Sequence, residues 1–279
     1  MKQGDLVVRK SYGGDVLFKI QELTSQKALL KGMDYRLLAD SPIYDLSEVQ
    51  VDSYKADPTI GLKTNEAMRS IIQYRKLREK EAGSTQSYFE VPGRVLHLDG
   101  DPLYLSKSMH LYNGLRVPAE GFYVTESNMA EALMQLLPQK NPDILVITGH
   151  DGILKNTKRN DWHNLQSYKN SHNFAKAVQV AREYERNRDS LVIIAGACQS
   201  FYEALLQAGA NFASSPARVL IHALDPLYIA AKVAFTSIKD TVQIKDIIQH
   251  TMSGLEGLGG METRGSYRMG LPGLNFLKR

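Results

Sequence analysis

Residues 143–148 read Asp-Ile-Leu-Val-Ile-Thr, and the chain continues with Gly149-His150-Asp151-Gly152. A second run of the same kind, Ser190-Leu191-Val192-Ile193-Ile194-Ala195, continues with Gly196-Ala197-Cys198-Gln199-Ser200. Short, near-continuous apolar runs are typical of strands that are buried on both faces of a parallel sheet. The two runs therefore predict an α/β fold in which a histidine and a cysteine follow two strands at equivalent positions.

The rest of the C-terminal part supports this fold class. Further apolar runs at 94–99 and 218–223 predict two more strands. Helical periodicity predicts helices at 128–137 behind Ser127 as N-cap, at 173–186, and from Gln199 through Ala208. Alternating strands and helices predict a mostly parallel sheet covered by helices on both faces, and the glycine-rich tail from Gly254 is expected to form loops.

The N-terminal part has a different pattern. Residues 1–50 contain short β-prone runs, and Gly13-Gly14 marks a turn between the first two, which predicts a small SH3-like β-domain. Residues 51–93 predict a helical connector that ends in a polar joint. The expected organisation is therefore a β-domain at 1–50, the connector at 51–93 and an α/β domain at 94–279.

Composition limits the classes of protein that this chain can belong to. The 279 residues carry a net charge of +4 without a long basic block, so nucleic acid is an unlikely partner. The single cysteine suits a reducing compartment, and the N-terminus lacks the apolar run of a secretion signal. The longest apolar runs are strand-length, so we expect a cytoplasmic protein without a membrane partner. No pattern in the sequence sets the oligomeric state.

Cys198 and His150 are the candidate catalytic pair. A thiol is mostly protonated at neutral pH, and a neighbouring imidazole can take its proton. The dipole of the helix expected to begin at Gln199 would favour the thiolate, and its N–H groups could hold an oxyanion. Either residue by itself is more often structural, the cysteine as a small core residue and the histidine as a polar cap. Their placement at equivalent strand ends favours the catalytic interpretation.

These motifs resemble those of the caspase-like cysteine peptidases. In that group an apolar strand ends in a histidine flanked by small residues, and a second strand about 50 residues later ends in Ala-Cys. Here the spacing is 198 − 150 = 48 residues. The resemblance implies a cysteine endopeptidase that needs no cofactor or metal. It also implies an oxyanion donor just after the histidine, which is the N–H of Asp151 or that of Gly152.

The whole chain also resembles the YabG family of proteases from spore-forming bacteria. The resemblance extends from Gly4-Asp5-Leu6-Val7-Val8-Arg9 through the histidine and cysteine motifs to the glycine-rich tail. It implies that spore coat and cortex proteins are the substrates and partners during late sporulation. It also implies a location in the mother cell and leaves open an association with the spore coat.

Three acids are candidates for substrate binding. Asp99 and Asp101 follow the first apolar strand of the α/β domain, and Asp225 follows the fourth. A carboxylate in this place would pair with a basic side chain, which predicts cleavage after arginine. The alternative is that the Asp-Gly-Asp-Pro sequence only caps a turn.

A second function class stays open at this point. The SH3-like domain carries Arg9, Lys10 and Lys19 and could bind nucleic acid or a protein, with the α/β domain as a non-catalytic scaffold. A third possibility concerns the chain itself, since the polar joint near Arg94 is a candidate site of self-cleavage.

Overall fold

The structure is a computed structural model, and it describes residues 1–49, 66, 69, 72, 73, 76, 89–154, 157–249 and 251–270. The expected polar joint and most of the expected helical connector lie outside these residues. The five described positions between 66 and 76 are helical.

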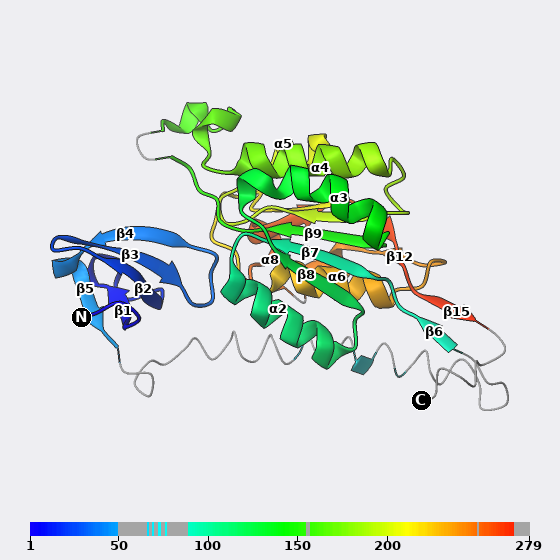
Figure 1. The fold of residues 1–279 in the computed structure, drawn as a ribbon, viewed down its shortest axis with the longest axis horizontal. Coiled ribbons are helices and arrows are strands. Elements are labelled where there is room, and N and C mark those ends of the chain that lie inside the picture. Colours follow the sequence, from blue (N-terminus) through cyan, green and yellow to red (C-terminus); the bar gives the residue numbers. More distant parts are fainter. Residues whose placement is uncertain are drawn as a thin grey trace.

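A six-stranded sheet forms the centre of the larger part of the protein (Figure 1). Its strand order is β13-β11-β10-β9-β7-β8, and all neighbours are parallel except β13, which pairs antiparallel to β11. The bounds are β7 Val95–Asp99, β8 Ala119–Tyr123, β9 Ile144–Thr148, β10 Val192–Ala195, β11 Phe212–Ser214 and β13 Leu258–Gly260. The predicted α/β class with a mostly parallel sheet is confirmed.

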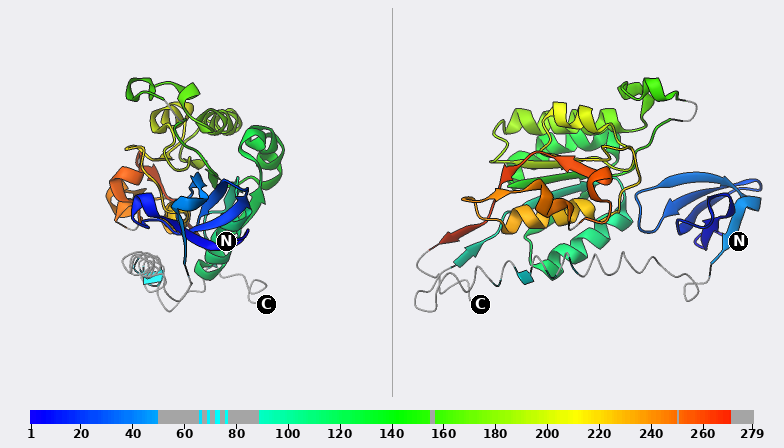
Figure 2. Two further views of the ribbon diagram at one scale, coloured as in Figure 1. Left: turned by 90° about the vertical axis from the view of Figure 1, so that its left-hand side faces the viewer. Right: turned by 180° about the vertical axis from the view of Figure 1, so that it is seen from behind.

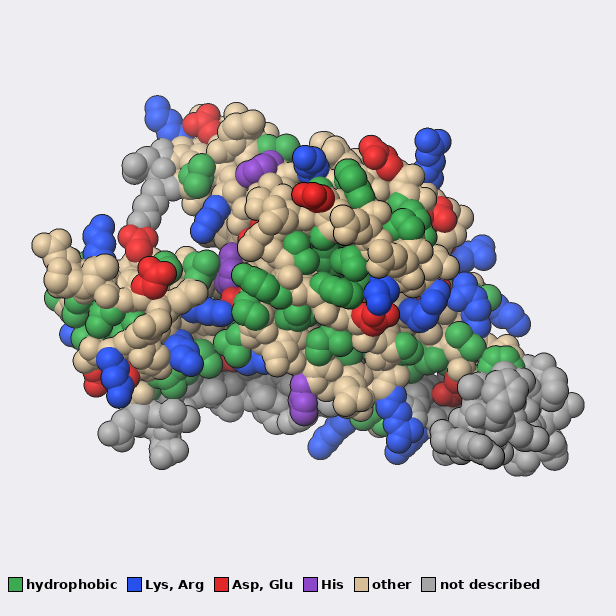
Figure 3. Space-filling model, in the orientation of Figure 1, with side chains coloured by type: hydrophobic (Ala, Val, Ile, Leu, Met, Phe, Trp, Pro, Cys, Tyr) green, Lys and Arg blue, Asp and Glu red, His purple; other side chains and the backbone are tan. Residues whose placement is uncertain are grey.

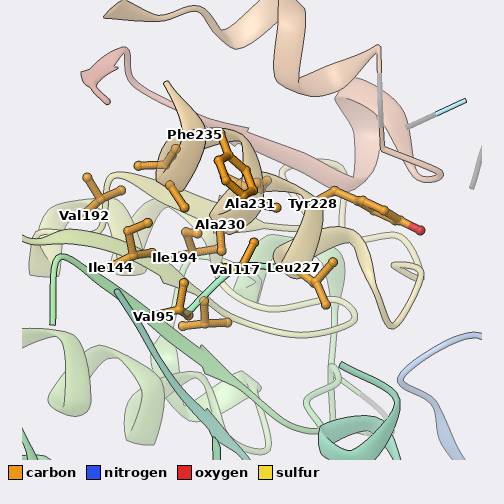
Figure 4. Packing of buried hydrophobic residues seen from close by; sticks show 14 of the residues in the cluster. Val95, Val117, Ile144, Val192, Ile194, Leu227, Tyr228, Ala230, Ala231 and Phe235 are labelled. Carbon is orange, nitrogen blue, oxygen red and sulfur yellow. The ribbon is translucent and has the colours of Figure 1, made fainter. Parts of the chain in front are cut away.

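Helices cover both faces of this sheet, as Figures 1 and 2 show. One face carries α2 Pro102–Leu115 and α6 Asp225–Phe235, and the other carries α3 Met129–Lys140, α4 Ser171–Tyr184 and α5 Tyr202–Ala208. Successive residues of a strand point to opposite faces, so each strand serves two cores. On β10, for example, Ile194 packs in the core beneath α6, whereas Ile193 packs in the core beneath α3 and α4. Figure 4 shows the first of these cores.

The N-terminal part forms a five-stranded antiparallel sheet with the order β4-β3-β2-β1-β5. Its strands are β1 Leu6–Arg9, β2 Phe18–Leu23, β3 Lys27–Gly32, β4 Leu38–Pro42 and β5 Leu46–Glu48. Val7, Phe18 and Leu30 are fully buried in its own small core. The sheet lies beside one end of the larger sheet (Figure 2), and the expectation of β-structure at the N-terminus is confirmed.

Two of the basic residues named for a binding role make contacts within the N-terminal part. The Arg9 guanidinium lies 3.9 Å from the centre of the Tyr12 ring, and Lys10 Nζ donates to the Tyr44 carbonyl. On the face shown in Figure 3, Lys and Arg side chains are interspersed with Asp and Glu. These features do not single out a nucleic-acid surface.

The remaining short elements complete the described fold. The strands are β6 Phe89–Val91, β12 Thr241–Val242, β14 Thr263–Arg264 and β15 Arg268–Gly270, and the helices are α7 Ile244–Ile248 and α8 Gly254–Gly257. Single 3-10 turns occur at Lys10–Tyr12, Ile43–Asp45, Glu126–Asn128, Arg159–Asp161 and Leu165–Ser167. Within the described ranges, every helix is too short or too polar to cross a lipid bilayer.

Four local predictions were wrong. Residues 218–223 are not a strand of the large sheet, where β11 is the parallel strand that follows β10. The helix after Cys198 begins at Tyr202, not Gln199. Helix α3 has Asn128 at its N-cap, since Ser127 lies inside a preceding 3-10 turn. The tail from Gly254 is not all loop, because β13 adds an edge strand to the sheet.

The two-faced core predicts a large difference between buried and exposed substitutions. Ile194 is fully buried, whereas Leu255 is 69% exposed. We expect Ile194→Ala to lower the free energy of unfolding by about 2–5 kcal/mol, because it leaves a cavity. Leu255→Ala should change it by less than about 0.5 kcal/mol. Urea unfolding of both variants measures this difference, and equal destabilisation would contradict the packing described here.

Candidate active site

The loops after β9 and β10 bring His150 and Cys198 to the same edge of the large sheet. β9 ends at Thr148 and β10 ends at Ala195, and the two strands are parallel neighbours. Their carboxyl ends therefore lie side by side, which is where ligands bind in open α/β sheets. The expectation that the two residues follow neighbouring strands is confirmed, and their catalytic roles stay a prediction.

The imidazole of His150 is held on two sides. Its Nε2 lies 2.8 Å from Oδ2 of Asp101, and its Nδ1 lies 3.4 Å from the carbonyl oxygen of Arg36. Because a carboxylate only accepts hydrogen bonds, Nε2 carries the proton in the contact with Asp101. Nδ1 can donate to the Arg36 carbonyl only when it is protonated as well, as in the imidazolium, and in the neutral ring Nδ1 is the nitrogen that can act as a base.

Asp101 therefore pairs with His150, whereas Asp99 pairs with Arg36. It is also the N-cap of α2, where its Oδ1 accepts from the backbone N–H groups of Leu103 and Tyr104. Lys31 Nζ lies 2.5 Å from its Oδ2. Burial acts to raise the pKa of this carboxyl, but the hydrogen bonds from His150 and Lys31 outweigh it and lower the pKa to about 2. Asp101 is thus ionised beside the imidazole at neutral pH.

A second acid, Glu126, holds the backbone of the loop that carries His150. Its Oε1 accepts from the backbone N–H of His150 at 2.7 Å. A Cβ added at Gly100 or Gly149 would lie 2.3 or 2.5 Å from the same oxygen. Both glycines are therefore needed for the close approach of this carboxylate, which fixes the backbone on which His150 stands.

Cys198 is fully buried. Its Sγ accepts from the backbone N–H of Ile221 at 3.2 Å. Burial raises the pKa of the thiol to about 12, although hydrogen bonds from the backbone of Ile221 and Arg36 act in the opposite direction. The thiol is thus protonated at neutral pH. The backbone of Arg36 lies against both Sγ of Cys198 and the imidazole of His150.

The backbone of the cysteine loop is unusual. Gly196 and Gln199 have φ values of 109° and 55°, and a positive φ costs energy for a residue with a side chain. The N–H groups of Cys198 and Asp151 donate no hydrogen bond in the part of the chain that the structure describes. The N–H of Gly152, by contrast, donates to the Asp151 carboxylate at 2.9 Å.

The Asp151 side chain joins the two loops. Its Oδ2 accepts from the hydroxyl groups of Ser171 and Ser200, the latter at 2.9 Å, and its Oδ1 accepts from the Asn170 N–H. The Ser200 hydroxyl in turn accepts from the Ala197 N–H. Burial raises the pKa of Asp151 despite these hydrogen bonds. One carboxylate therefore connects the histidine loop, the cysteine loop and the start of α4.

Asp99 forms a buried ion pair with the Arg36 side chain. Both residues are fully buried. Arg36 Nη1 donates to Asp99 Oδ1 at 2.9 Å, and Nη2 lies 2.9 Å from Oδ2. Arg36 Nε and Nη2 also donate to the Ala223 carbonyl, and the guanidinium lies 5.0 Å from the centre of the Tyr104 ring. Burial tends to raise the pKa of Asp99, but Arg36 lowers it strongly.

Asp225, the third predicted substrate-binding acid, makes different contacts. Its two carboxylate oxygens accept from the backbone N–H groups of Met252 and Ser253 at 2.8 and 3.0 Å. It holds the chain that follows α7, whereas the contact to arginine is made by Asp99.

Several residues of this site were not predicted from the sequence. Arg36 lies within the β-prone residues 1–50, and only its contacts reveal its place in the site. Glu126 is more than 20 residues from His150 in the chain, and no motif connects the two. Asp101 was recognised, but as a residue that binds substrate and not as the partner of the histidine. Among the described residues, no group of three or more His, Cys, Asp or Glu could hold a metal ion.

The fold and this sheet edge define an α/β protein in which a buried cysteine and a His150–Asp101 pair lie at the carboxyl ends of the parallel strands, together with the buried Arg36–Asp99 ion pair. The family model described as YabG peptidase U57 matches residues 2–272. The sporulation-specific protease YabG of Bacillus subtilis (strain 168) is 44% identical over 283 residues, which cover 96% of this chain and 97% of that relative. The chain belongs to the YabG peptidase family of sporulation proteases, and this confirms the family resemblance.

The lowered pKa of Asp101 predicts a specific loss of stability in acid. The pKa of this carboxyl is about 2 in the folded protein, compared with 3.8 when it is free. A lowered pKa in the folded state contributes stability above the unfolded value, and this contribution is lost as the pH falls through the folded value. Between about pH 4 and pH 2, wild type should therefore lose more free energy of unfolding than Asp101→Asn. Urea unfolding at a series of pH values checks this, and parallel curves would refute it.

Proposed function

We propose that this sporulation protease is a cysteine endopeptidase that cleaves after arginine, with Cys198 as the nucleophile and His150 as its base. The observation that carries the proposal is the position of Arg36. Its side chain is paired with Asp99, and its carbonyl oxygen faces His150. An arginine of a substrate would place its side chain against Asp99 and its scissile bond beside His150.

Asp101 completes the catalytic group in this proposal. Its contact with Nε2 holds the imidazole with Nδ1 free to accept the thiol proton, which is the role of the acid in a triad. The charge of Asp101 would also stabilise the imidazolium formed in that step. The expectation of a dyad therefore becomes a triad of Cys198, His150 and Asp101.

The reaction has two steps. His150 takes the proton of Cys198, Sγ attacks the carbonyl carbon after arginine, the C–N bond breaks, and the imidazolium protonates the leaving amine. Water then attacks the thioester, the C–S bond breaks, and the carboxylate product and the free thiol result. Substrate binding also displaces the backbone that now covers the thiol.

The oxyanion of each step needs N–H donors that are not already used. The N–H groups of Asp151 and Cys198 meet this condition, whereas that of Gly152 already donates to the Asp151 side chain. We therefore assign the oxyanion hole to Asp151 and Cys198 and leave Gly152 out of it. Because the donors of an oxyanion hole are backbone N–H groups, the side chain of Asp151 does not prevent its N–H from serving as a donor.

The proposal for the biological substrates rests on the family and not on the geometry. The curated relative is named a sporulation-specific protease, and we propose that spore coat and cortex proteins are the substrates of this chain. Cytoplasmic action in the mother cell, with possible coat association, belongs to the same proposal. The expected division into a β-domain, a connector and a protease domain also stays a proposal.

Loss of the nucleophile tests the catalytic assignment. We expect Cys198→Ala and His150→Ala each to lower the rate of cleavage of a spore coat protein extract by at least about 10³-fold. His163→Ala, which changes an exposed histidine, should have no effect. Mass spectrometry of the new termini measures the cleavage. Unchanged processing by folded Cys198→Ala protein would end the proposal.

Arginine selection has a test of its own. Asp99→Asn should lower the ratio of kcat/KM for an arginine peptide to that for the matched alanine peptide by at least about 100-fold, because the bidentate charge pair is lost. Asp225→Asn is the matched acid control and should leave the ratio unchanged. A wild type that cleaves both peptides equally well would show that the pocket does not select arginine.

A further inference from the structure

The turn that carries Arg36 pairs with residues 221–223 through main-chain contacts, as a bound peptide would. Tyr35 and His222 form an antiparallel bridge. The Ala223 N–H donates to the Asp34 carbonyl at 2.8 Å, and the Arg36 N–H donates to the Ile221 carbonyl at 3.4 Å. Recognition through main-chain hydrogen bonds to an exposed edge is how many proteins bind extended peptides.

This arrangement explains why residues 218–223 are β-prone although they are not a strand of the large sheet. Their edge atoms pair with residues 34–36 on one side, while the Ile221 N–H donates to Sγ of Cys198 on the other. The segment is thus adjacent to the nucleophile and to the turn at once. The same edge would align a substrate with Cys198.

The turn covers the catalytic groups. Cys198 and Asp99 are 0% exposed, and His150 is 7% exposed. Further polar contacts tie the turn to α2. The Tyr104 hydroxyl lies within hydrogen-bond distance of the carbonyl oxygens of Gly32 and Tyr35, which share its single proton, and Lys107 Nζ donates to the Met33 carbonyl at 2.8 Å. A substrate cannot reach Asp99 and Cys198 while these contacts persist.

We propose that residues 34–37 are a built-in, substrate-like inhibitor of this protease, with Arg36 in the pocket that takes the arginine of a substrate. The inference rests on the proposed function of Cys198 and Asp99 and adds the regulation of that site. The N-terminal β-domain is then a part that must release its turn before another protein can be cleaved.

The geometry on the far side of Arg36 favours an inhibitor over a readily cleaved substrate. The Leu37 N–H donates to the Tyr35 carbonyl at 2.7 Å, and the Leu37 carbonyl accepts from the Gly32 N–H at 2.8 Å. These bonds bend the chain at Arg36 and anchor Leu37 to the end of β3. After a cut, the leaving amine would remain beside the thioester, where it can re-form the bond.

Removal of the arginine side chain tests the inference in the full-length protein. We expect Arg36→Ala to raise the turnover of a fluorogenic arginine peptide by at least about tenfold, because an inhibitor within the chain acts at a high effective concentration. The rate of Cys198 alkylation by iodoacetamide at neutral pH should rise by a similar factor. Arg9→Ala is the matched control. It changes an arginine of the same β-domain that contacts Tyr12 and not Asp99, and it should change neither rate.

A second variant guards against misfolding, because Arg36→Ala leaves the Asp99 carboxylate buried without its partner. Lys107→Ala removes one tie between α2 and the turn and leaves the pocket intact. We expect it to raise both rates by about twofold to fivefold. If wild type, Arg36→Ala and Lys107→Ala turn over the peptide equally, by a reaction that Cys198→Ala abolishes, the inhibitor is refuted and the proposed function stands.

The two readouts separate the two proposals. Faster alkylation of Cys198 in Arg36→Ala, with no peptide turnover in any variant, would support the cover over the thiol and refute the catalytic assignment. A cut in the wild-type chain between Arg36 and Leu37 that is absent from Cys198→Ala would support the placement of Arg36 in the substrate pocket. Equal alkylation of wild type and Arg36→Ala would overturn the inference.

Discussion

The ion pair between Arg36 and Asp99 connects the antiparallel N-terminal sheet to the carboxyl edge of the parallel sheet. Both side chains are fully buried, so each has lost its hydration. Such a pair adds little net stability compared with an apolar contact of the same size, whereas the loss of one partner is costly because the other stays charged and buried. The pair therefore acts mainly to fix position: it holds the backbone of Arg36 against His150, and the rest of the site is arranged around that contact.

Three carboxylates hold the loops that follow β9 and β10. Glu126 holds the backbone of His150, Asp101 orients its ring, and Asp151 ties the histidine loop to the cysteine loop through Ser200. None of the three is replaceable by an apolar residue without leaving buried N–H or O–H donors unpaired, which is the costly outcome for a buried polar group. The precision of this sheet edge thus depends on hydrogen bonds and not on the apolar cores beneath it.

The sequence predicted the parts of the fold that periodicity controls. The strands that end before His150 and Cys198 were found because they are buried on both faces and read as apolar runs. The run at 218–223 has the same composition but pairs with residues 34–36 instead of the sheet, and local pattern does not distinguish these partners. In the site, His150 and Cys198 stood out by their equivalent positions. Arg36 and Glu126 did not, because their roles arise from contacts between residues far apart in the chain.

The main-chain pairing of residues 221–223 has one more consequence, which concerns how many different sequences could bind there. The segment meets residues 34–36 through carbonyl and amide groups that every amino acid possesses, and only the Asp99 pocket receives a side chain by charge. An edge of this kind is indifferent to the identity of the second and third residues of a bound peptide. Under the proposed function, many unrelated proteins could then be cleaved, provided that each offers an unfolded stretch with one arginine opposite Asp99. The rate of cleavage would depend on how readily that stretch becomes extended.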